Sequence, residues 1–377
     1  MSLAEDRVSR AALSRVTEPG DSRITELVER FGAIDLLRRL RRGDGLSGVF
    51  ADVAARLTTC DPELELTRAE RLGIRFVIPG DREWPEQLDD LANAEPLNNR
   101  SGVPVGLWVR GPVLLDSLRD SVAVVGSRAA TTYGDQMTAD ISLTLAGAGR
   151  AVVSGAAFGI DRAAHRGALA AGGTTIAILA CGVDRAYPKA HASLIEHLAT
   201  HGAVISEGPL GCAPQRIRFL ARNRLIAAIT RGTVVVEAAV RSGALNTANW
   251  ANRLNRAVMG VPGPVTSAPS GGVHQLIRAG RAQLVTNGEE VLELVGAAGE
   301  HLLAEPRGPV RPRDALSLTD QQVLDAVPVA TGAPSPSIAR VAGLNLLEVT
   351  AALARLHVAG LVEQDADGWR LAALAHN

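Results

Sequence analysis

Residues 122–134 read V-A-V-V-G-S-R-A-A-T-T-Y-G, in which a short β-branched run leads straight into a glycine turn and then into a helical stretch. The same order recurs at 151–165, in A-V-V-S-G-A-A-F-G-I-D-R-A-A-H. Further apolar runs, spaced widely enough for crossover helices, lie at 175–179, 203–205, 233–236 and 257–259. Buried strands that alternate with helices are typical of a parallel, doubly wound sheet. The sequence therefore predicts an α/β fold built around such a sheet.

The carboxyl ends of the first two predicted strands carry glycine and small polar residues. Gly126, Ser127 and Arg128 follow the first strand, and Ser154 and Gly155 follow the second. Ligands of open α/β sheets bind in the crevice outside these strand ends, and the free N–H groups of a helix N-terminus attract anions. We therefore expect these five residues to contact a phosphate-bearing ligand. The turn lacks the G-x-G-x-x-G pattern of dinucleotide-binding proteins, so no cofactor is predicted.

The composition of the 377-residue chain limits the class of protein. Its 39 basic and 40 acidic residues leave a formal net charge of -1, so any surface that binds nucleic acid must be local. The three cysteines stand far apart without C-x-x-C spacing, which supports neither a disulfide framework nor a zinc site, and no metal is predicted. No stretch approaches the roughly 18 apolar residues of a membrane span, so we expect a cytoplasmic protein without membrane contact.

One segment of the chain is strongly basic. Between residues 208 and 288 ten arginines, among them Arg222 and Arg224, accompany a single carboxylate, Glu237. Such a local excess of positive charge is typical of a surface that binds a phosphate backbone. Lys189 is the only lysine in the chain, and because lysine and arginine differ in hydration and geometry, its retention suggests contact with a single phosphate.

A few aromatic rings lie close to the predicted site. Tyr187 precedes Pro188 in a turn, and Phe158 and Phe219 are placed in site loops. Unpaired bases stack on such rings, whereas a duplex offers no free base faces. We therefore expect a preference for single-stranded DNA with little base specificity. Packing is the alternative role for these rings, above all for Phe158.

Asp161 and His165 lie one helical turn apart in the second turn-helix segment. That spacing would suit a metal pair or an acid–base pair, but it more often fixes a helix against its loop. We therefore predict no catalytic residues.

The flanks differ in character from the centre. Residues 1–72 carry apolar side chains at helical spacing and predict a small helical domain, and residues 73–296 contain the predicted DNA-binding sheet. Residues 297–314 are rich in proline and charge, as in a linker. Residues 315–377 predict three helices and a hairpin, the elements of a winged helix-turn-helix domain.

Eight ordered motifs between residues 73 and 285 resemble those of the DNA-processing protein A (DprA, also called Smf) family. They include G-S-R-x-x-T-x-Y-G at 126–134, S-G-A-A-F-G-I-D at 154–161, D-x-x-Y-P-K at 184–189, R-F-L-A-R-N-R at 218–224 and S-G-A-L-N-T-A at 242–248. The helical part would then be a SAM-like or helix-hairpin-helix-like domain, and the core an extended Rossmann-like domain.

The same resemblance implies a homodimer that binds single-stranded DNA, protects it, and helps to load a RecA-type recombinase during natural transformation. Arg128 and Lys189 match the basic residues of the family's DNA pocket. Arg222 and Arg224 match arginines that border the same sheet edge.

A different class of protein shares this architecture. Nucleoside-monophosphate phosphoribohydrolases carry P-G-G-x-G-T-x-x-E, in which glycines hold the phosphate and the glutamate supports glycosidic cleavage. The equivalent stretch here, 237–248, contains S-G-A without a following acid. Because glycosidic hydrolysis depends on such a carboxylate, we expect a DNA-binding protein rather than an enzyme.

Overall fold

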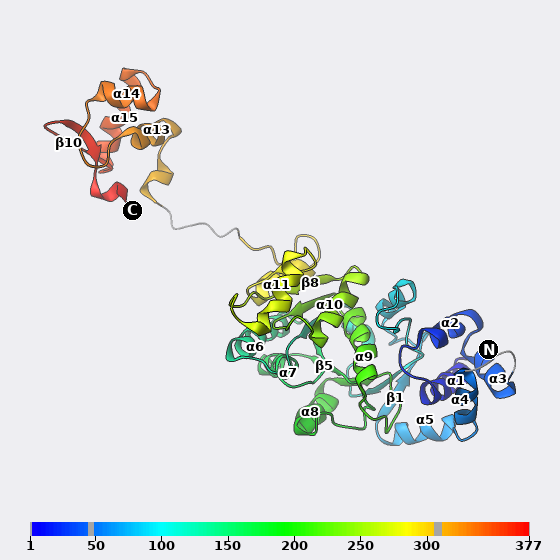
Figure 1. The fold of residues 1–377 in the computed structure, drawn as a ribbon. Helices are drawn as coiled ribbons and strands as arrows, with labels where there is room; N and C mark the ends of the chain where they lie inside the picture. The colour runs from blue at the N-terminus through cyan, green and yellow to red at the C-terminus, as the bar shows by residue number, and fades with distance from the viewer. Residues whose placement is uncertain (1, 44–48, 305–310, 377) are drawn as a thin grey trace. The chain divides into compact units, whose positions relative to one another are not determined.

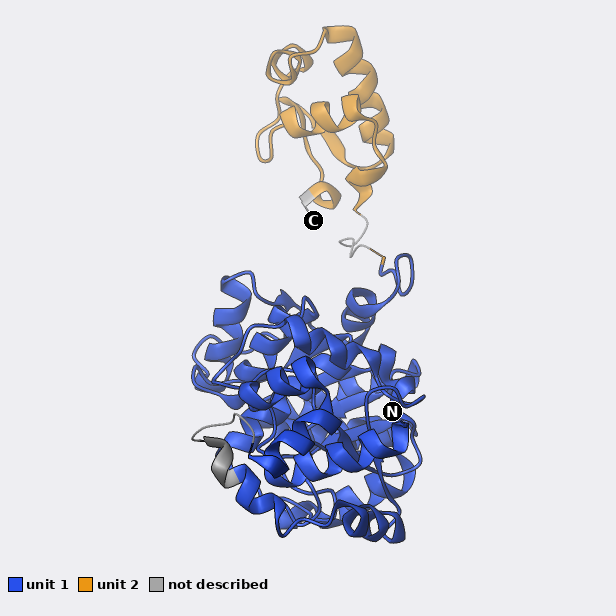
Figure 2. Ribbon diagram, turned by 90° about the vertical axis from the view of Figure 1, so that its right-hand side faces the viewer, with its two compact units in different colours: residues 1–303 blue, residues 304–377 orange. Residues whose placement is uncertain are grey.

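The computed structural model describes residues 2–43, 49–304 and 311–376. The chain forms two compact units, Met1–Leu303 (unit 1) and Ala304–Asn377 (unit 2), which Figure 2 shows in blue and orange. Part of the predicted linker, including Pro306 and Pro309, lies outside the described residues.

Unit 1 is built on a nine-stranded sheet with the order β1-β2-β6-β5-β4-β3-β7-β8-β9. The strands are β1 (Ile74–Val77), β2 (Leu107–Arg110), β3 (Val122–Val125), β4 (Val152–Ser154), β5 (Thr175–Ile178), β6 (Ala203–Ser206), β7 (Gly232–Val235), β8 (Ala257–Gly260) and β9 (Gln283–Leu284). The strands from β6 to β9 in this order pair in parallel, whereas β1 and β2 extend the sheet in antiparallel fashion. The predicted α/β fold with a parallel sheet is confirmed.

Strand β3 shows why these strands appear in the sequence as continuous apolar runs. Val122 and Val124 pack into one core, and Ala123 and Val125 pack into another. Successive side chains point to opposite faces of a strand, so a strand buried on both faces has no polar alternation. Helices α6 (Thr132–Gly147), α7 (Ile160–Ala170) and α12 (Gly288–Val295) cover the first face, and α9 (Arg216–Ile229), α10 (Gly243–Arg253) and α11 (Gly271–Arg278) cover the second.

The chain order places a topological switch point between β3 and β7. From β3 the chain winds outward through β4, β5 and β6, and it then returns to the other side of β3 to form β7. The loops after β3 and β7 therefore diverge and leave a crevice at the carboxyl ends of the strands.

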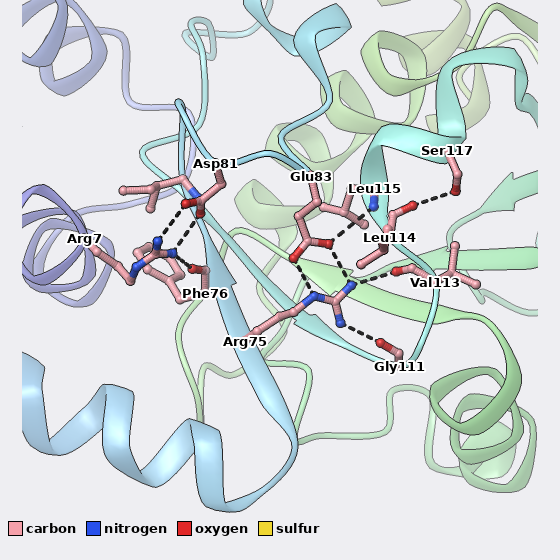
Figure 3. A network of polar contacts seen from close by, with 11 residues as sticks. Arg7, Arg75, Phe76, Asp81, Glu83, Gly111, Val113, Leu114, Leu115 and Ser117 are labelled. Atoms are coloured by element: carbon pink, nitrogen blue, oxygen red, sulfur yellow. Dashed lines mark hydrogen bonds and ion pairs between the residues drawn. The ribbon is translucent and has the colours of Figure 1, made fainter. Parts of the chain in front are cut away.

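The N-terminal helices belong to unit 1 and lie beside the antiparallel edge (Figure 1). They are α1 (Leu3–Val16), α2 (Ser22–Phe31), α3 (Ala33–Arg42), α4 (Val49–Leu57) and α5 (Pro62–Arg71). Helix α8 (Ala192–His201) packs against β5 and β6 and shares a hydrophobic core with α1 and α5. Figure 3 shows the polar network at this junction, where Arg7 of α1 pairs with Asp81 and donates to the Phe76 carbonyl. Arg75 of β1 pairs with Glu83 at 2.7 Å.

Unit 2 contains α13 (Leu318–Ala326), α14 (Ser335–Ala342) and α15 (Leu346–Val358), followed by the antiparallel pair β10 (Val362–Asp365) and β11 (Gly368–Leu371). Three helices and a hairpin thus occur in the predicted order. Within the described ranges no single helix has both the length and the apolar composition to cross a bilayer. Only α14 and α15 taken together, with a bend of 106° between them, meet that test.

Candidate nucleic-acid interface

A groove of about 1140 Å³ opens at the switch point of the sheet. Its walls come from the turn after β3, the loop after β7, and the helices α9, α10 and α11. This is the edge of the sheet at which the sequence predicted the site.

The groove is lined by arginine. Among the described residues that line it, Asp161 is the only carboxylate, and five arginines accompany it. These five residues, here named the groove arginines, are Arg128, Arg216, Arg222, Arg241 and Arg281. In the described part of the chain, none of them forms an ion pair with a carboxylate within 4.0 Å. The positive charge of the groove is therefore available to a ligand.

Arg222 forms part of the groove floor. Only 6% of its surface is exposed, and its Nη1 atom donates to the carbonyl of Ile178 at 3.0 Å. A Cβ atom at Gly155 would lie 1.4 Å from that Nη1, so only glycine leaves room for the guanidinium. Burial lowers the pKa of Arg222, although nearby Asp161 opposes the shift. Its Nε atom is buried without a hydrogen-bond partner among the described groups.

Asp161 fixes the loop that carries Gly155. Its Oδ2 atom accepts hydrogen bonds from the backbone N–H groups of Gly155 and Ala157, at 3.2 and 3.3 Å. Burial raises the pKa of this carboxyl, and the charge of Arg222 acts in the opposite direction. These contacts support the structural interpretation of Asp161 over the catalytic one.

His165 is buried and does not line the groove. Its Nδ1 atom is 2.7 Å from Oγ1 of Thr175, which itself donates to the Val152 carbonyl. Burial lowers the pKa of His165 to about 3, assisted by the nearby His191 and Arg222. Over the ranges that the structure describes, no group of three or more His, Cys, Asp or Glu side chains is arranged to hold a metal ion.

Two aromatic rings stand beside the groove arginines. The guanidinium carbon of Arg128 lies 5.0 Å from the ring centroid of Phe219, and the Tyr187 ring lies 5.8 Å from the same ring. Both rings line the groove, and 42% of Tyr187 is exposed. Phe219 lies on α9 rather than in a loop. Phe158 is exposed but packs edge-on against His191 and does not line the groove.

Arg224 has a different place from the one predicted. It is 0% exposed and forms two bonds to Glu207, at 2.6 and 2.7 Å, and its Nε atom donates to the Gly102 carbonyl. The guanidinium lies behind α9, away from the groove. A side chain in this position cannot reach a DNA backbone, so the prediction that Arg224 contacts DNA is wrong.

Half of the arginines in the basic segment are neutralised by acids from outside it. Arg218, Arg224, Arg231, Arg253 and Arg256 pair respectively with Glu18, Glu207, Asp120, Glu95 and Asp90. Of the remaining five, Arg216, Arg222, Arg241 and Arg281 line the groove. The sequence indicates the total charge of the segment but does not show which residues are paired.

Of the other predicted site residues, some line the groove and some do not. Gly126 and Ser127 line the groove, and Gly126 packs so closely on Ile160 that a Cβ would lie 2.6 Å from that side chain. Ser154 is buried and donates to the Val124 carbonyl at 2.7 Å, so it supports the sheet. Lys189, in the short helix η3 (Lys189–His191), is exposed but does not line the groove.

Comparisons with known proteins agree with this architecture. The sequence profile of the family described as DNA recombination-mediator protein A matches residues 75–296. A relative from Mycobacterium tuberculosis, named for DNA processing, is 43% identical over 367 residues, which cover 96% of this chain and 93% of its own. Protein Smf of Escherichia coli is 37% identical over 312 residues, covering 80% of this chain and 78% of its own.

Two solved structures are similar. DNA processing protein A from Streptococcus pneumoniae superimposes with a TM-score of 0.63 at 31% identity, covering 78% of this chain and 98% of its own. DNA processing protein A from Helicobacter pylori, studied for its single-stranded DNA binding mode, gives a TM-score of 0.50 at 28% identity, covering 58% and 94%.

Proposed function

Because this chain belongs to the DNA recombination-mediator protein A family, we propose that it binds single-stranded DNA in the arginine-lined groove and acts as a recombination mediator. In this role it shields incoming or exposed single strands and helps to load a RecA-type recombinase onto them. It acts as a homodimer, in the cytoplasm, where single strands and recombinase meet. Only the resemblance to the family supports the recombinase and the dimer.

One observation carries this proposal: five arginines without ion-pair partners, within the described residues, line a single groove with one carboxylate. Each Lys or Arg that neutralises a phosphate releases condensed counterions, which supplies sequence-independent affinity. Phe219 and Tyr187 beside those arginines offer surfaces for unpaired bases. The combination of a basic groove and a few rings is typical of sites for single-stranded nucleic acid.

The alternative, glycosidic hydrolysis of a nucleoside monophosphate, has less support. Glu237 is 1% exposed and accepts hydrogen bonds from the N–H and the hydroxyl of Thr131, so it supports the start of α6 instead of facing the groove. Asp161 is held by backbone amides. Glycosidic cleavage depends on a carboxylate that is free to act at the bond, and the contacts of Glu237 and Asp161 leave neither in that role. The groove favours binding over catalysis.

A titration tests the proposal. The purified protein is titrated with labelled single-stranded and duplex oligonucleotides of equal length at several salt concentrations. We expect tighter binding of the single strand, with a logarithmic salt slope of about -0.7 per phosphate neutralised. Equal affinity for the duplex, or affinity that does not change with salt, would refute the proposed function. Release of base from nucleoside monophosphates would instead favour the hydrolase.

A further inference from the structure

We propose that the groove contains a second contact zone, made of side-chain carboxamides, that forms hydrogen bonds with the base edges of bound DNA. This carboxamide zone consists of Asn98, Asn246, Asn249 and Gln275. The inference rests on the proposed function. It adds hydrogen bonds to base edges to the phosphate contacts of the arginines and the stacking on the aromatic rings. Arginine accounts for phosphate contacts and aromatic rings account for stacking, but neither explains several uncharged amides in the same groove.

The carboxamide zone comes from other elements of the groove wall than Arg128 and Phe219 do. Asn246 and Asn249 project from α10, Gln275 comes from α11, and Asn98 comes from the loop before β2. Arg128 and Phe219, in contrast, come from the turn after β3 and from α9. Each nucleotide of a strand carries both a phosphate and a base. A groove lined by arginines and by carboxamides can therefore contact phosphates and bases at the same time.

Two of the four amides have no structural bond in the described part of the chain. Gln275 and Asn98 are both exposed, and neither side chain takes part in a hydrogen bond with another described group. Within the described ranges, no packing or helix-capping contact accounts for Gln275, and at Asn98 the positive φ of 54° favours asparagine but leaves its carboxamide unbonded. Their donors and acceptors are free to meet a ligand.

The other two amides are oriented by neighbours that leave their donors available. The Nδ2 atom of Asn223 donates to Oδ1 of Asn246 at 3.3 Å, and Arg281 donates to Oδ1 of Asn249 at 3.4 Å. In each case the carboxamide oxygen is the group that is used. Among the described residues neither Nδ2 group donates a hydrogen bond, and both side chains belong to residues that line the groove.

The chemistry of a carboxamide suits an exposed base. Asn and Gln carry one acceptor and two donors without charge, and they pair in bidentate fashion with base edges that present a donor next to an acceptor. Unpaired bases expose their Watson–Crick edges, which a duplex hides. Because each of the four bases presents such groups, the zone contacts bases without requiring one sequence, and it adds to the preference for single strands.

A thermodynamic cycle tests the inference. One axis is the DNA: oligo(dT) against an oligonucleotide of the same length that carries abasic residues and the same number of phosphates. The other axis is the protein: the natural chain against the double variant Gln275→Ala, Asn98→Gly. Glycine is chosen at residue 98 because its φ is 54°, a conformation that alanine would strain. Gln136→Ala, an exposed glutamine on α6 outside the groove, is the matched control.

We expect the double variant to bind oligo(dT) about tenfold more weakly, as for the loss of two neutral hydrogen bonds. It should bind the abasic strand within about twofold of the natural protein, because the lost contacts have no base to meet. The Gln136→Ala control should match the natural protein on both strands. Thermal unfolding of each variant confirms that the fold is intact, and Gln275→Leu serves as a variant that preserves side-chain volume.

The outcomes separate this inference from the proposed function. If the double variant weakens both strands equally, or neither, the amides do not contact bases and the inference is wrong while single-strand binding stands. If the natural protein binds neither strand, both the proposed function and the inference fail.

Discussion

Arg128 combines three properties that a phosphate contact requires. It is exposed, it lies in the turn between β3 and α6, and it forms no ion pair with the other described residues. Its guanidinium is placed beside Phe219, which limits its freedom before DNA arrives. A charge-assisted hydrogen bond of this kind contributes about 1.5 to 3 kcal/mol. We therefore expect Arg128→Ala to bind single-stranded DNA at least about tenfold more weakly.

Fluorescence anisotropy with a labelled oligonucleotide measures this loss. Arg166→Ala is the matched control, because Arg166 is exposed on α7 and does not line the groove. Normal binding by a folded Arg128→Ala variant would show that this arginine is only a solvated surface residue.

His165 makes folding sensitive to acid. Its pKa in the folded protein is lowered by burial to about 3, against 6.5 for the free side chain, so the fold holds the neutral form. The stabilisation is present above pH 6.5 and is lost as the pH falls toward 3. Between pH 7 and pH 5 this residue alone should remove about 2 kcal/mol from the free energy of unfolding.

Urea unfolding at pH 7 and pH 5, followed by tryptophan fluorescence, measures that difference. His165→Gln cannot titrate in this range, so its stability should fall by about 2 kcal/mol less than that of the natural protein over the same interval. Parallel losses in the two proteins would mean that His165 is not held neutral.

Helix α9 links the groove to the rest of unit 1, because its two sides have different partners. One side presents Arg216, Phe219 and Arg222 to the groove, and the other buries Arg224 against Glu207. Glu207 also accepts from the N–H of Gly20 in the connection between α1 and α2. Removing one partner of a buried ion pair leaves the other charge without compensation, at a cost of about 3 to 5 kcal/mol.

Arg224→Ala should therefore lower the stability of unit 1 by that amount, and its effect on DNA binding should appear only through loss of folded protein. Urea unfolding provides the stability, and anisotropy on the folded fraction provides the affinity. A stable Arg224→Ala variant with specifically weakened DNA binding would contradict the buried position of this arginine.

The strands of this fold could be predicted closely, whereas the pairing of charges could not. The apolar runs at 122–125 and 257–259 lie within β3 and β8, because burial on both faces leaves a continuous β-branched signature. Arg222 and Arg224 are two residues apart and look alike in the sequence. The orientation of α9 places Arg222 in the groove and Arg224 against Glu207. This orientation depends on tertiary contacts that the local sequence does not show.

The same limit explains the missed site residues. Asn98 lies in a segment that the sequence marks only as a loop, and the chain before β2 is held beside the groove by hydrogen bonds of Gln87 to α9 and of Glu95 to α10. Gln275 ends the stretch S-G-G-V-H-Q at 270–275, which does not mark it as a ligand-binding residue. Both lie in glycine-bearing stretches, 93–106 and 270–275, but nothing in those stretches indicates that they meet in one groove, so tertiary contact alone reveals them.

At the scale of the whole molecule, only one of the two compact units carries the arginine-lined groove. The groove lies wholly within unit 1. Arg355, the arginine of α15, pairs with Asp320 at 2.6 Å. A chain that ends at residue 304 should therefore bind single-stranded DNA within about tenfold of the full chain, or roughly 1.4 kcal/mol.

Side-by-side titrations of the full and shortened chains, with size-exclusion chromatography as a check on folding, measure this ratio. Loss of binding by a folded, shortened chain would identify unit 2 as the DNA reader and would overturn the assignment of the groove.

The acidic side chains that pair with the basic segment have a consequence for gene exchange between relatives. Five arginines between residues 208 and 288 take their partners from acids that lie before the segment, such as Glu18 near the start of the chain and Glu207 at the end of β6. The segment therefore depends on acids outside it and cannot be exchanged on its own. A chimera that received it without those acids would carry unmatched guanidinium groups on α9, on α10 and in the loops after them, so the two parts of the gene are expected to be inherited together.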